Sequence, residues 1–523
     1  MTRRYLDSSV VISAYDSHGD RRATSILDES DEILTSRLVY LEVLRNLRRL
    51  VDSRDFAVLL AEFDIDYSRM TSGKHVQPSG SECRFSGRSD SATGRVPGDC
   101  RGYRWGMTPL DDVRAHVQSR LPVASPVLVP FDAAAGLVLA ADVVAAENVP
   151  PFDNTAVDGY AVRAADTAAA PCELRVTGEM AAGAQHVATV EPGGCVRIMT
   201  GAPLPLGCDA IVMVEDTERT GGNSVRVNRS VDPGDGIRRA GSDVVQGDTP
   251  LRAGTVVTAA VQAVLSTVNA RTVSVWPRPR VGVISTGDEL VDDGSPLRPG
   301  QIRESNRTML LRLVAEAGAE AVDLGIVRDD ETELESALRT AVNNDGLDAL
   351  VTSGGVSMGD YDIVKSVLSR IADMAWFQIA MKPAKPFAFG TLRNDDGVDV
   401  PVFGLPGNPV SSLVSFELIA RPALEVMMRT AGSMTGRRLV RGIIDYAVPR
   451  QPDGKVHFDR CVASWGADGR IHVARVAAQA SHQLAASALA NALVEIPDGN
   501  GVAAGQEVLV TLLGAGAHLP TSA

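Results

Sequence analysis

The sequence contains no stretch of 18 consecutive apolar residues, so it predicts no transmembrane helix. Its first residues, MTRRYLDSSVVISAYD, include two arginines but lack the long apolar segment and the small-residue cleavage site of a secretory signal peptide. The chain has six cysteines, and they form no CxxC pair and accompany no histidine cluster at zinc spacing. These absences predict a cytoplasmic protein with reduced thiols that is neither exported nor inserted in a membrane.

An excess of basic residues is also missing. The chain carries 51 Lys and Arg against 65 Asp and Glu, a net charge of −14, and the acidic excess lies after residue 106. An acidic surface does not attract nucleic acid through its general field, so local lysines, backbone amides or a bound cation must hold any phosphate-bearing ligand. We therefore expect a small anion in a pocket, and no nucleic acid as a partner of the main body.

The length and the patterning predict several domains, because one hydrophobic core serves at most about 250 to 300 residues. Residues 1–67 read as half of an α/β unit, and the scattered Ser, Gly, Arg and Pro of residues 68–106 predict a disordered linker. Beyond it, we expect Thr108 to cap a helix that Pro109 begins. The further predicted domains are a discontinuous helical domain (107–149 and 250–276), a β-rich domain (150–249), an α/β domain (277–432) and a C-terminal β-barrel or sandwich (436–515).

The predicted fold class is thus multi-domain α/β plus β. Between residues 277 and 432, strand patterns such as PRVGVISTG and DALVTSGG alternate with helix patterns such as NRTMLLRLVAEAG and ETELESALRTAV. This alternation predicts a doubly wound, parallel sheet.

Three strand ends of this sheet run into turns of small residues, at Ser285–Leu290, Thr352–Asp360 and Gly404–Ser412. Ligands of open α/β sheets bind beyond the carboxyl ends of the strands. Glycine lets a phosphate approach the backbone, and each turn opens a helix whose free amides favour an anion. A single turn of this kind is more often only a tight connection, but three on one sheet edge predict one concave anion site.

Charged residues accompany these turns. Lys382 and Lys385, in FQIAMKPAKPFAFG, stand beside prolines that stiffen the backbone, where they can meet phosphate or another oxyanion. Carboxylates beside a phosphate site make sense if Mg²⁺ bridges them, although an acidic residue such as Asp360 is as often only a helix cap. The acidic candidates are Glu289, Asp329, Asp330, Asp360 and Asp362.

The β-rich segment contributes further polar loops. PPFDNTAVDGYAV places Asp153 and Asp158 among turn residues, RIMTGAPLP places Thr200 between Gly and Pro, and GIRRAGSD contains Asp243. Taken alone, these loops are explained better by turn chemistry than by function. Together with the α/β motifs, they would form a second wall of a site.

Seven ordered motifs, PPFDNTAVDGYAVRAAD, RIMTGAPLPLGCDAIVMVED, IRRAGSDV, GVISTGDEL, SGGVSMGDYD, AMKPAKPFAFG and GLPGNPVSS, resemble the molybdopterin molybdenumtransferase family, known as MoeA and as the E domain of gephyrin. The resemblance spans about Met107 to Leu513. One departure is Gln378, where we expect a basic residue before the KPAKP segment.

The resemblance implies a homodimer with a site composed from both subunits. It also implies hydrolysis of adenylylated molybdopterin to release AMP, coupled to transfer of molybdate onto the dithiolene sulfurs with the help of Mg²⁺. The implied catalytic positions are Asp158, Thr200, Asp243, Glu289, Asp329 and Asp362, of which Glu289 and Asp362 would hold the metal. The implied substrate-binding positions are Gly354, Gly355, Ser357, Lys382, Lys385, Pro406, Gly407, Asn408 and Pro409.

Residues 1–67 resemble the first half of a PIN-type ribonuclease, as in VapC toxins, through Asp7 and Glu42. A PIN active site needs further carboxylates from the second half of that fold, which the linker does not supply. We therefore expect a truncated remnant without nuclease activity.

Three other functions compete with molybdenum insertion. Adenylylation of molybdopterin uses the same kind of α/β domain, but the motifs FDNTAVDGY and RIMTGAP favour insertion. A non-catalytic scaffold is the second alternative, and the intact set of acidic residues and lysines argues against it. A toxin-derived nuclease is the third, and it would require RNA cleavage by residues 1–106 alone.

Overall fold

The computed structural model describes residues 106–514, apart from 185, 187, 357–362, 433, 435 and 478, and it also describes residue 519. The predicted PIN-like segment therefore lies outside the described residues, as does the predicted linker up to residue 105. Within the described part, no helix is long and apolar enough to cross a membrane. The cysteines found there, Cys172, Cys195, Cys208 and Cys461, are all unpaired.

A six-stranded sheet forms the α/β domain, in the strand order β15-β12-β16-β20-β19-β17. The first four strands are mutually parallel, as predicted, and the last two add antiparallel at one edge. The strands are β12 (Arg280–Thr286), β15 (Glu320–Val327), β16 (Ala349–Ser353), β17 (Asp373–Gln378), β19 (Pro386–Arg393) and β20 (Asp399–Leu405). A parallel ribbon, β13 (Leu290–Val291) with β14 (Ile302–Arg303), lies between β12 and the next helix.

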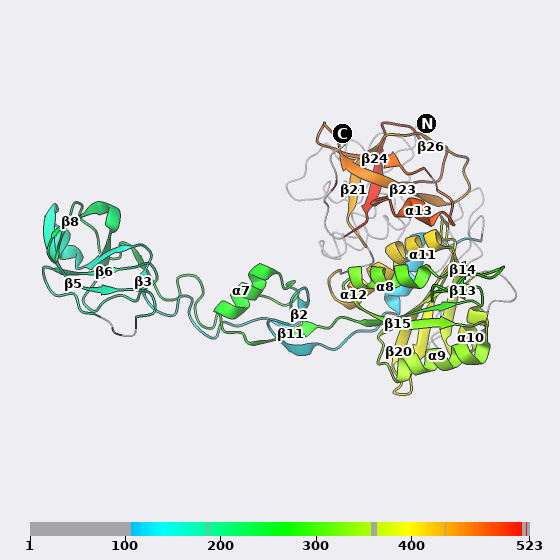
Figure 1. The fold of residues 1–523 in the computed structure, drawn as a ribbon, viewed down its shortest axis with the longest axis horizontal. Helices are drawn as coiled ribbons and strands as arrows, with labels where there is room; N and C mark the ends of the chain where they lie inside the picture. The colour runs from blue at the N-terminus through cyan, green and yellow to red at the C-terminus, as the bar shows by residue number, and fades with distance from the viewer. Residues whose placement is uncertain are drawn as a thin grey trace, which may run out of the picture. The chain divides into compact units, whose positions relative to one another are not determined.

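Helices cover both faces of this sheet (Figure 1). Successive strand residues point to opposite faces, so each face has its own core. Val351 and Phe403 belong to the core shared with α8, α11 and α12, whereas Leu350 and Val402 belong to the core shared with α9 and α10. The helices are α8 (Asn306–Glu316), α9 (Glu331–Asn343), α10 (Ile363–Ile371), α11 (Pro409–Ser415) and α12 (Arg421–Met427). The doubly wound arrangement is confirmed.

A π-helical stretch, η3 (Phe416–Ala420), joins α11 to α12. Proline has no N–H, so Pro422 cannot donate to the carbonyl of Leu418, four residues earlier. The Nε of Arg114 donates to that carbonyl instead, at 3.0 Å. Arg114 belongs to α6 (Leu110–Ser119), which packs its buried residues Val113 and Val117 into the same core. A segment distant in sequence therefore satisfies the backbone of the interrupted helix.

The structure corrects two predictions about the segments around α6. Thr108 does not cap the helix, because its backbone pairs with Gln378 and Ala380 and the helix begins at Leu110 without a side-chain cap. Residues 107–149 and 250–276 do meet, but mainly as a sheet of β1 (Val127–Pro130), β11 (Thr272–Trp276) and β2 (Val138–Leu139) under one helix, α7 (Ala259–Thr267). The expected helical domain is thus largely a sheet, because Val and Thr favour strands in VLVP and TVSVW.

The β-rich segment forms a six-stranded sheet in the order β7-β4-β6-β5-β9-β8. Its strands are β4 (Gly159–Val162), β5 (Cys172–Met180), β6 (Gly194–Ile198), β7 (Ala210–Met213), β8 (Thr217–Gly221) and β9 (Ser224–Val227), with short helical turns η1 (Ala164–Thr167) and η2 (Val214–Asp216). A two-stranded ribbon, β3 (Asn154–Thr155) with β10 (Ile237–Arg238), carries the predicted polar loops.

The C-terminal segment is a closed barrel, because β23 pairs with both β24 and β25 and the remaining strands complete the ring. Its strands are β21 (Leu439–Ile444), β23 (Val456–Trp465), β24 (Ile471–Arg475), β25 (Ala492–Ile496) and β27 (Glu507–Leu512), accompanied by the ribbon of β22 (Val448–Pro449) and β26 (Gly501–Val502) and by helix α13 (Leu484–Ser487). One α/β segment, β18 (Met381–Lys382), pairs with β23 of the barrel.

We predict that Arg114→Met lowers the free energy of unfolding by about 1 to 3 kcal/mol, because the carbonyl of Leu418 loses its donor. The control is Arg312→Met, which removes an exposed arginine paired only with Glu316 and should change stability by less than about 1 kcal/mol. Urea unfolding measures both variants. Equal stability of the two variants would contradict a role for Arg114 in completing the interrupted helix.

Candidate functional site

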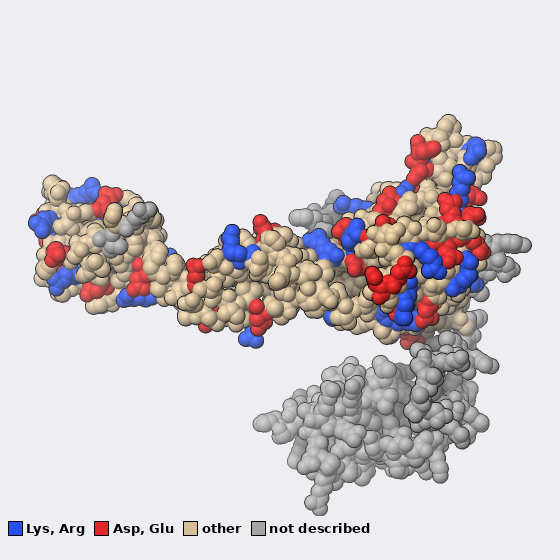
Figure 2. Space-filling model, turned by 90° about the horizontal axis from the view of Figure 1, so that it is seen from below, with Lys and Arg blue, Asp and Glu red and all other residues tan. Residues whose placement is uncertain are grey.

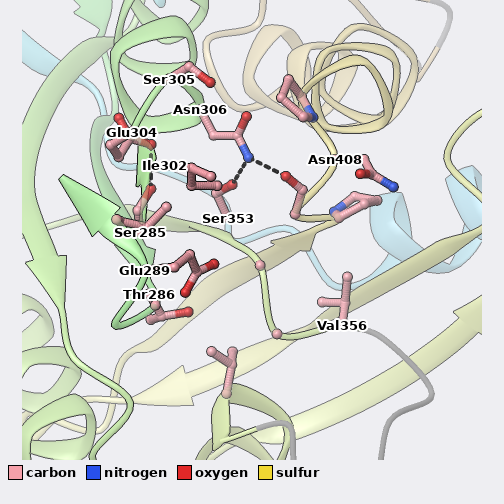
Figure 3. Close-up of a pocket in the computed structure, with 18 of the residues that line it drawn as sticks. Ser285, Thr286, Glu289, Ile302, Glu304, Ser305, Asn306, Ser353, Val356 and Asn408 are labelled. Carbon is pink, nitrogen blue, oxygen red and sulfur yellow. Dashed lines mark hydrogen bonds between the residues drawn. The ribbon is translucent and has the colours of Figure 1, made fainter. Parts of the chain in front are cut away.

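A cavity of about 920 Å³ lies beyond the carboxyl ends of the parallel strands (Figure 3). All three predicted turns line it, through Ser285–Gly287 after β12, Ser353–Val356 after β16 and Pro406–Pro409 after β20. We call it the turn cavity. Its lining includes the predicted positions Glu289, Asp329, Gly354, Gly355, Pro406, Gly407, Asn408 and Pro409. Ser357 and Asp362 lie outside the described residues.

Glycine is favoured at position 354, where the second turn approaches the third. Gly354 has a φ of +96°, which side-chain-bearing residues rarely adopt, and its N–H donates to the carbonyl of Leu405 at 3.0 Å. A Cβ built on Gly407 would lie 3.6 Å from the Cα of Gly354. The second and third turns therefore meet backbone to backbone.

Asn306, the first residue of α8, ties the same two turns together. Its Nδ2 donates to the Oγ of Ser353 at 2.8 Å and to the carbonyl of Gly407 at 2.7 Å (Figure 3). The preceding Glu304 accepts from the Oγ of Ser285 at 3.0 Å and from the N–H of Arg307 at 2.6 Å, which links the first turn to the start of the helix. All three turns are thus held at the beginning of α8.

Helix beginnings give the turn cavity a favourable field for an anion. Helices α8, α10 and α11 begin at Asn306, Ile363 and Pro409, and all three residues line the cavity. The first amides of a helix carry partial positive charge and have no partner within the helix. The positive ends of three helix dipoles therefore border the cavity. At α8, Glu304 already accepts the N–H groups of Arg307 and Thr308, and at α11 Pro409 has no N–H and Val410 donates to Ser481, so the dipoles and not the first amides of these two helices favour an anion.

Carboxylates also line the turn cavity. Glu289 and Asp329 are present as predicted, and the backbone amides of Asp288 and Asp329 each donate to the other residue's carboxylate, at 3.5 and 3.4 Å. Within the described ranges, no three His, Cys, Asp or Glu side chains are close enough to hold a metal ion. Mg²⁺ usually takes only one or two carboxylates and completes its shell with water and substrate phosphates, so Glu289 and Asp329 fit it as a partial ligand set.

The predicted lysines lie in a separate cavity of about 770 Å³, which we call the lysine cavity. Lys382 and Lys385 line it together with barrel residues, and Pro386 is the residue common to both cavities. This corrects the expectation of one site that contains both the turns and the lysines. The reason is β18, which pairs with the barrel strand β23 and so directs Lys382 toward the barrel. Gln378, the departure from the family pattern, lines neither cavity.

Other basic groups of the lysine cavity are already paired. Arg450 contacts Asp453 and Asp498, at 2.6 and 3.2 Å, and Lys455 and His457 also contact Asp453. Burial raises the pKa of Asp453, but the hydrogen bonds and charges of His457 and Lys455 outweigh it and lower that pKa to about 2. Lys382 and Lys385 form no ion pair with a described residue, so both ammonium groups remain available to an oxyanion.

The predicted positions of the β-rich segment line neither cavity of this chain. Asp158 accepts from the N–H and the Oγ1 of Thr200, both at 2.7 Å, and these hydrogen bonds lower the pKa of Asp158. Asp153 accepts from the N–H of Ala240 and from the guanidinium of Arg239 at 2.6 Å, and both hydrogen bonds lower its pKa. Asp243 uses its N–H to bond the carbonyl of Val149. These loops are thus tied to one another by hydrogen bonds, and Asp158, Thr200 and Asp243 are exposed.

Sequence reasoning missed several residues of the turn cavity. Asn306 had a local signal, since a polar residue at the start of a helix after a strand commonly bonds neighbouring backbone. His482 and Leu484, which line the same cavity from the barrel segment, had none. Their position depends on how the barrel packs, which local sequence does not encode.

These features define a multi-domain α/β protein with an anion-binding cavity at the carboxyl edge of a parallel sheet and a basic cavity beside it. The face shown in Figure 2 agrees with local recognition, because Lys and Arg intermingle there with Asp and Glu. Anion binding therefore rests on the two cavities and not on a broad basic patch of that face.

Comparison with known proteins identifies the family. Three family models match: the MoeA N-terminal region (domain I and II) at residues 108–269, a probable molybdopterin binding domain at 282–426, and the MoeA C-terminal region (domain IV) at 448–513. The chain belongs to the molybdopterin molybdenumtransferase (MoeA) family, as its motifs predicted.

Individual relatives are similar to this chain along nearly their whole length. Molybdopterin molybdenumtransferase 2 of Mycobacterium tuberculosis is 41% identical over 416 residues, which cover 77% of this chain and 99% of the relative. The Haemophilus influenzae molybdopterin molybdenumtransferase is 34% identical and 98% covered. The crystal structure of the molybdopterin biosynthesis moeA protein from Pyrococcus horikoshii OT3 is 30% identical, with a TM-score of 0.62, and the match covers 78% of this chain and all of that one.

We predict that Asn306→Ala lowers the free energy of unfolding by about 1 to 3 kcal/mol, because Ser353 and Gly407 both lose their donor in a partly buried place. Thr308→Ala, an exposed side chain one position into the same helix turn, is the control and should be neutral within about 0.5 kcal/mol. Denaturant unfolding measures both, and a neutral Asn306→Ala would show that the turns do not depend on this bridge.

Proposed function

We propose that this chain inserts molybdenum into molybdopterin, as the final step in making a molybdenum cofactor. The observation that carries the proposal is the pair of adjoining cavities. One has helix beginnings and carboxylates suited to a pyrophosphate with a bound cation, and the other has two lysines, without an ion pair to any described residue, that suit molybdate. Membership in the molybdopterin molybdenumtransferase family supports the same reaction.

The substrate of the turn cavity is adenylylated molybdopterin, which is hydrolysed to release AMP. Its volume of about 920 Å³ suits a ligand of this size, since small-molecule sites commonly span about 300 to 1,000 Å³. The positive dipole ends of α8 and α11 attract the phosphate oxygens, and the Gly354–Gly355 turn lets these oxygens approach the backbone. The tie at Asn306 keeps these groups in place before the substrate arrives.

Mg²⁺ assists this hydrolysis, with Glu289 and Asp329 as its protein ligands in the described part and Asp362 as a third candidate. When bound, the ion neutralises negative charge that develops on the leaving phosphate. The protein's own contribution is to place Glu289 in the first turn and Asp329 beside Asp288, whose N–H donates to the Asp329 carboxylate at 3.5 Å.

Molybdate occupies the lysine cavity. The ammonium groups of Lys382 and Lys385 attract the oxyanion, while the neighbouring Asp453 already neutralises Arg450 and Lys455. Pro386 borders both cavities, so the oxyanion lies next to the substrate's cavity. This arrangement favours transfer between two bound reactants over capture of molybdate from solution.

Asp158, Thr200 and Asp243 act from the partner subunit of a homodimer. Their exposed, hydrogen-bonded loops line neither cavity of their own chain, as expected for a wall that closes a site in a second copy. Adenylylation of molybdopterin remains the second candidate for the α/β domain. The match of the β-rich and C-terminal segments to MoeA models favours insertion.

We predict that Glu289→Ala lowers kcat for AMP release by about 100-fold or more, because Mg²⁺ loses a ligand and charge on the leaving group is less stabilised. The assay supplies adenylylated molybdopterin, Mg²⁺ and molybdate, and couples AMP release to reconstitution of an apo molybdoenzyme. Glu333→Ala, an exposed glutamate at the start of α9, should behave as wild type. Absence of AMP release by the folded wild-type chain would refute the proposed function.

We predict that Lys382→Gln raises the KM for molybdate by about 10-fold and leaves the KM for adenylylated molybdopterin unchanged, because this lysine lines only the lysine cavity. Lys365→Gln, on α10 near Trp376, is the control and should change neither constant. Initial rates at varied molybdate concentration distinguish the outcomes. If only the KM for adenylylated molybdopterin changed, molybdate would have to bind outside the lysine cavity.

A further inference from the structure

A single barrel loop, Gln479–Leu484, forms part of the wall of both cavities. Gln479, Ala480 and Ser481 line the lysine cavity. The next residues that face a cavity, His482 and Leu484, line the turn cavity. The carbonyl of Ser481 accepts the N–H of Val410 at 3.2 Å, which attaches the loop to the first turn of α11. The loop thus separates the two proposed reactants.

Arg460, on the barrel strand β23, holds this loop from behind. Its side chain is only 1% exposed, and its Nη1 donates to the carbonyl of Gln483 and to the Oγ of Ser487, both at 2.8 Å. Its Nη2 donates to the carbonyl of Ala480 at 3.2 Å. The side chain of Gln479 completes the contact by bonding the N–H and the carbonyl of Arg460, at 3.0 and 2.8 Å.

Such a buried guanidinium constrains the loop strongly. Burial of a charged group is costly unless its donors are satisfied, and here burial lowers the pKa of Arg460. The carbonyls of Ala480 and Gln483 accept hydrogen bonds from the guanidinium only while the loop keeps its present conformation. The position of His482, between these two anchors, is therefore set by Arg460.

His482 is placed to contact a ligand. Its side chain is exposed to the turn cavity and forms no hydrogen bond with a described residue. The described carboxylates of this cavity, Glu289, Glu304 and Asp329, outnumber its basic side chains, which are His482 and Arg303. Arg303 already donates to the carbonyl of Ser295 at 2.6 Å. Among the described residues, the imidazole therefore has no competing hydrogen-bond partner in a cavity suited to phosphate.

We propose that His482 contacts the phosphate-bearing substrate in the turn cavity, and that Arg460 is a positioning residue that holds the loop against both cavities. This inference rests on the proposed function. It makes the barrel a part of the reaction site, through a side chain that reaches the substrate and a buried cation that fixes where that side chain stands.

The test measures both KM values, kcat and the thermal midpoint for the full chain. His482→Gln should raise the KM for adenylylated molybdopterin by about 10-fold, the loss of one hydrogen bond to a charged group, with the KM for molybdate unchanged. Arg460→Lys keeps the charge but loses the forked donors, so it should raise both KM values by about 3-fold or more. A purely structural role would lower the active fraction and leave both KM values unchanged.

Matched controls are His472→Gln, another histidine of the barrel, and Arg441→Lys, an exposed arginine on β21, since neither lines a cavity. If Arg460→Lys does not fold, Ser487→Ala, which removes one acceptor of Arg460, decides the point by a smaller rise in both KM values. Wild-type turnover with unchanged KM values in His482→Gln and the loop variants would overturn this inference alone. A wild-type chain that releases no AMP would overturn the proposed function and this inference together.

Discussion

Parallel pairing of β12, β16 and β20 is the constraint from which the site follows. Parallel strands bring their carboxyl ends to one edge, so three separate connections must leave the sheet side by side. Large side chains in these connections would fill the space between them. The positive φ of Gly354 favours glycine, which has no side chain to fill that space. The cavity is therefore a product of strand direction first and of individual ligand-binding residues second.

A buried ionic contact connects the α/β domain to the barrel. Glu417, in the π-helical stretch, is 1% exposed and accepts from Arg421 at 2.8 Å and from Arg437 at 2.6 Å. Arg437 also donates to the carbonyl of Gly514, after the last barrel strand, at 2.8 Å. Two guanidinium groups compensate one buried carboxylate. One of them, that of Arg437, lies just before the first barrel strand and contacts both Gly514, after the last barrel strand, and Glu417, in the helical segment that begins at the turn cavity.

Local signals were sufficient to predict much of this molecule. The alternation of strand and helix patterns and the Gly-rich strand ends are encoded within short stretches, and the structure places the three turns around one cavity as expected. The lysines were assigned to that same cavity because sequence cannot show that β18 pairs with the barrel. The place of His482 depends on the hydrogen bond between Val410 and Ser481, which are 71 positions apart, and Arg114 donates to a carbonyl 304 positions away, that of Leu418. Such contacts arise from tertiary packing, and no local sequence pattern predicts them.

The loop shared by the two cavities also bears on how this architecture can change over evolutionary time. A barrel that was attached to the α/β domain without lining a cavity could be lost, replaced or shortened without changing the reaction. Here the Gln479–Leu484 loop lines both cavities, and the buried guanidinium of Arg460 holds it. Insertions between Gln479 and Leu484 would disturb both compartments at once, so natural length variation should concentrate in other barrel loops, such as the exposed turn around Asp468.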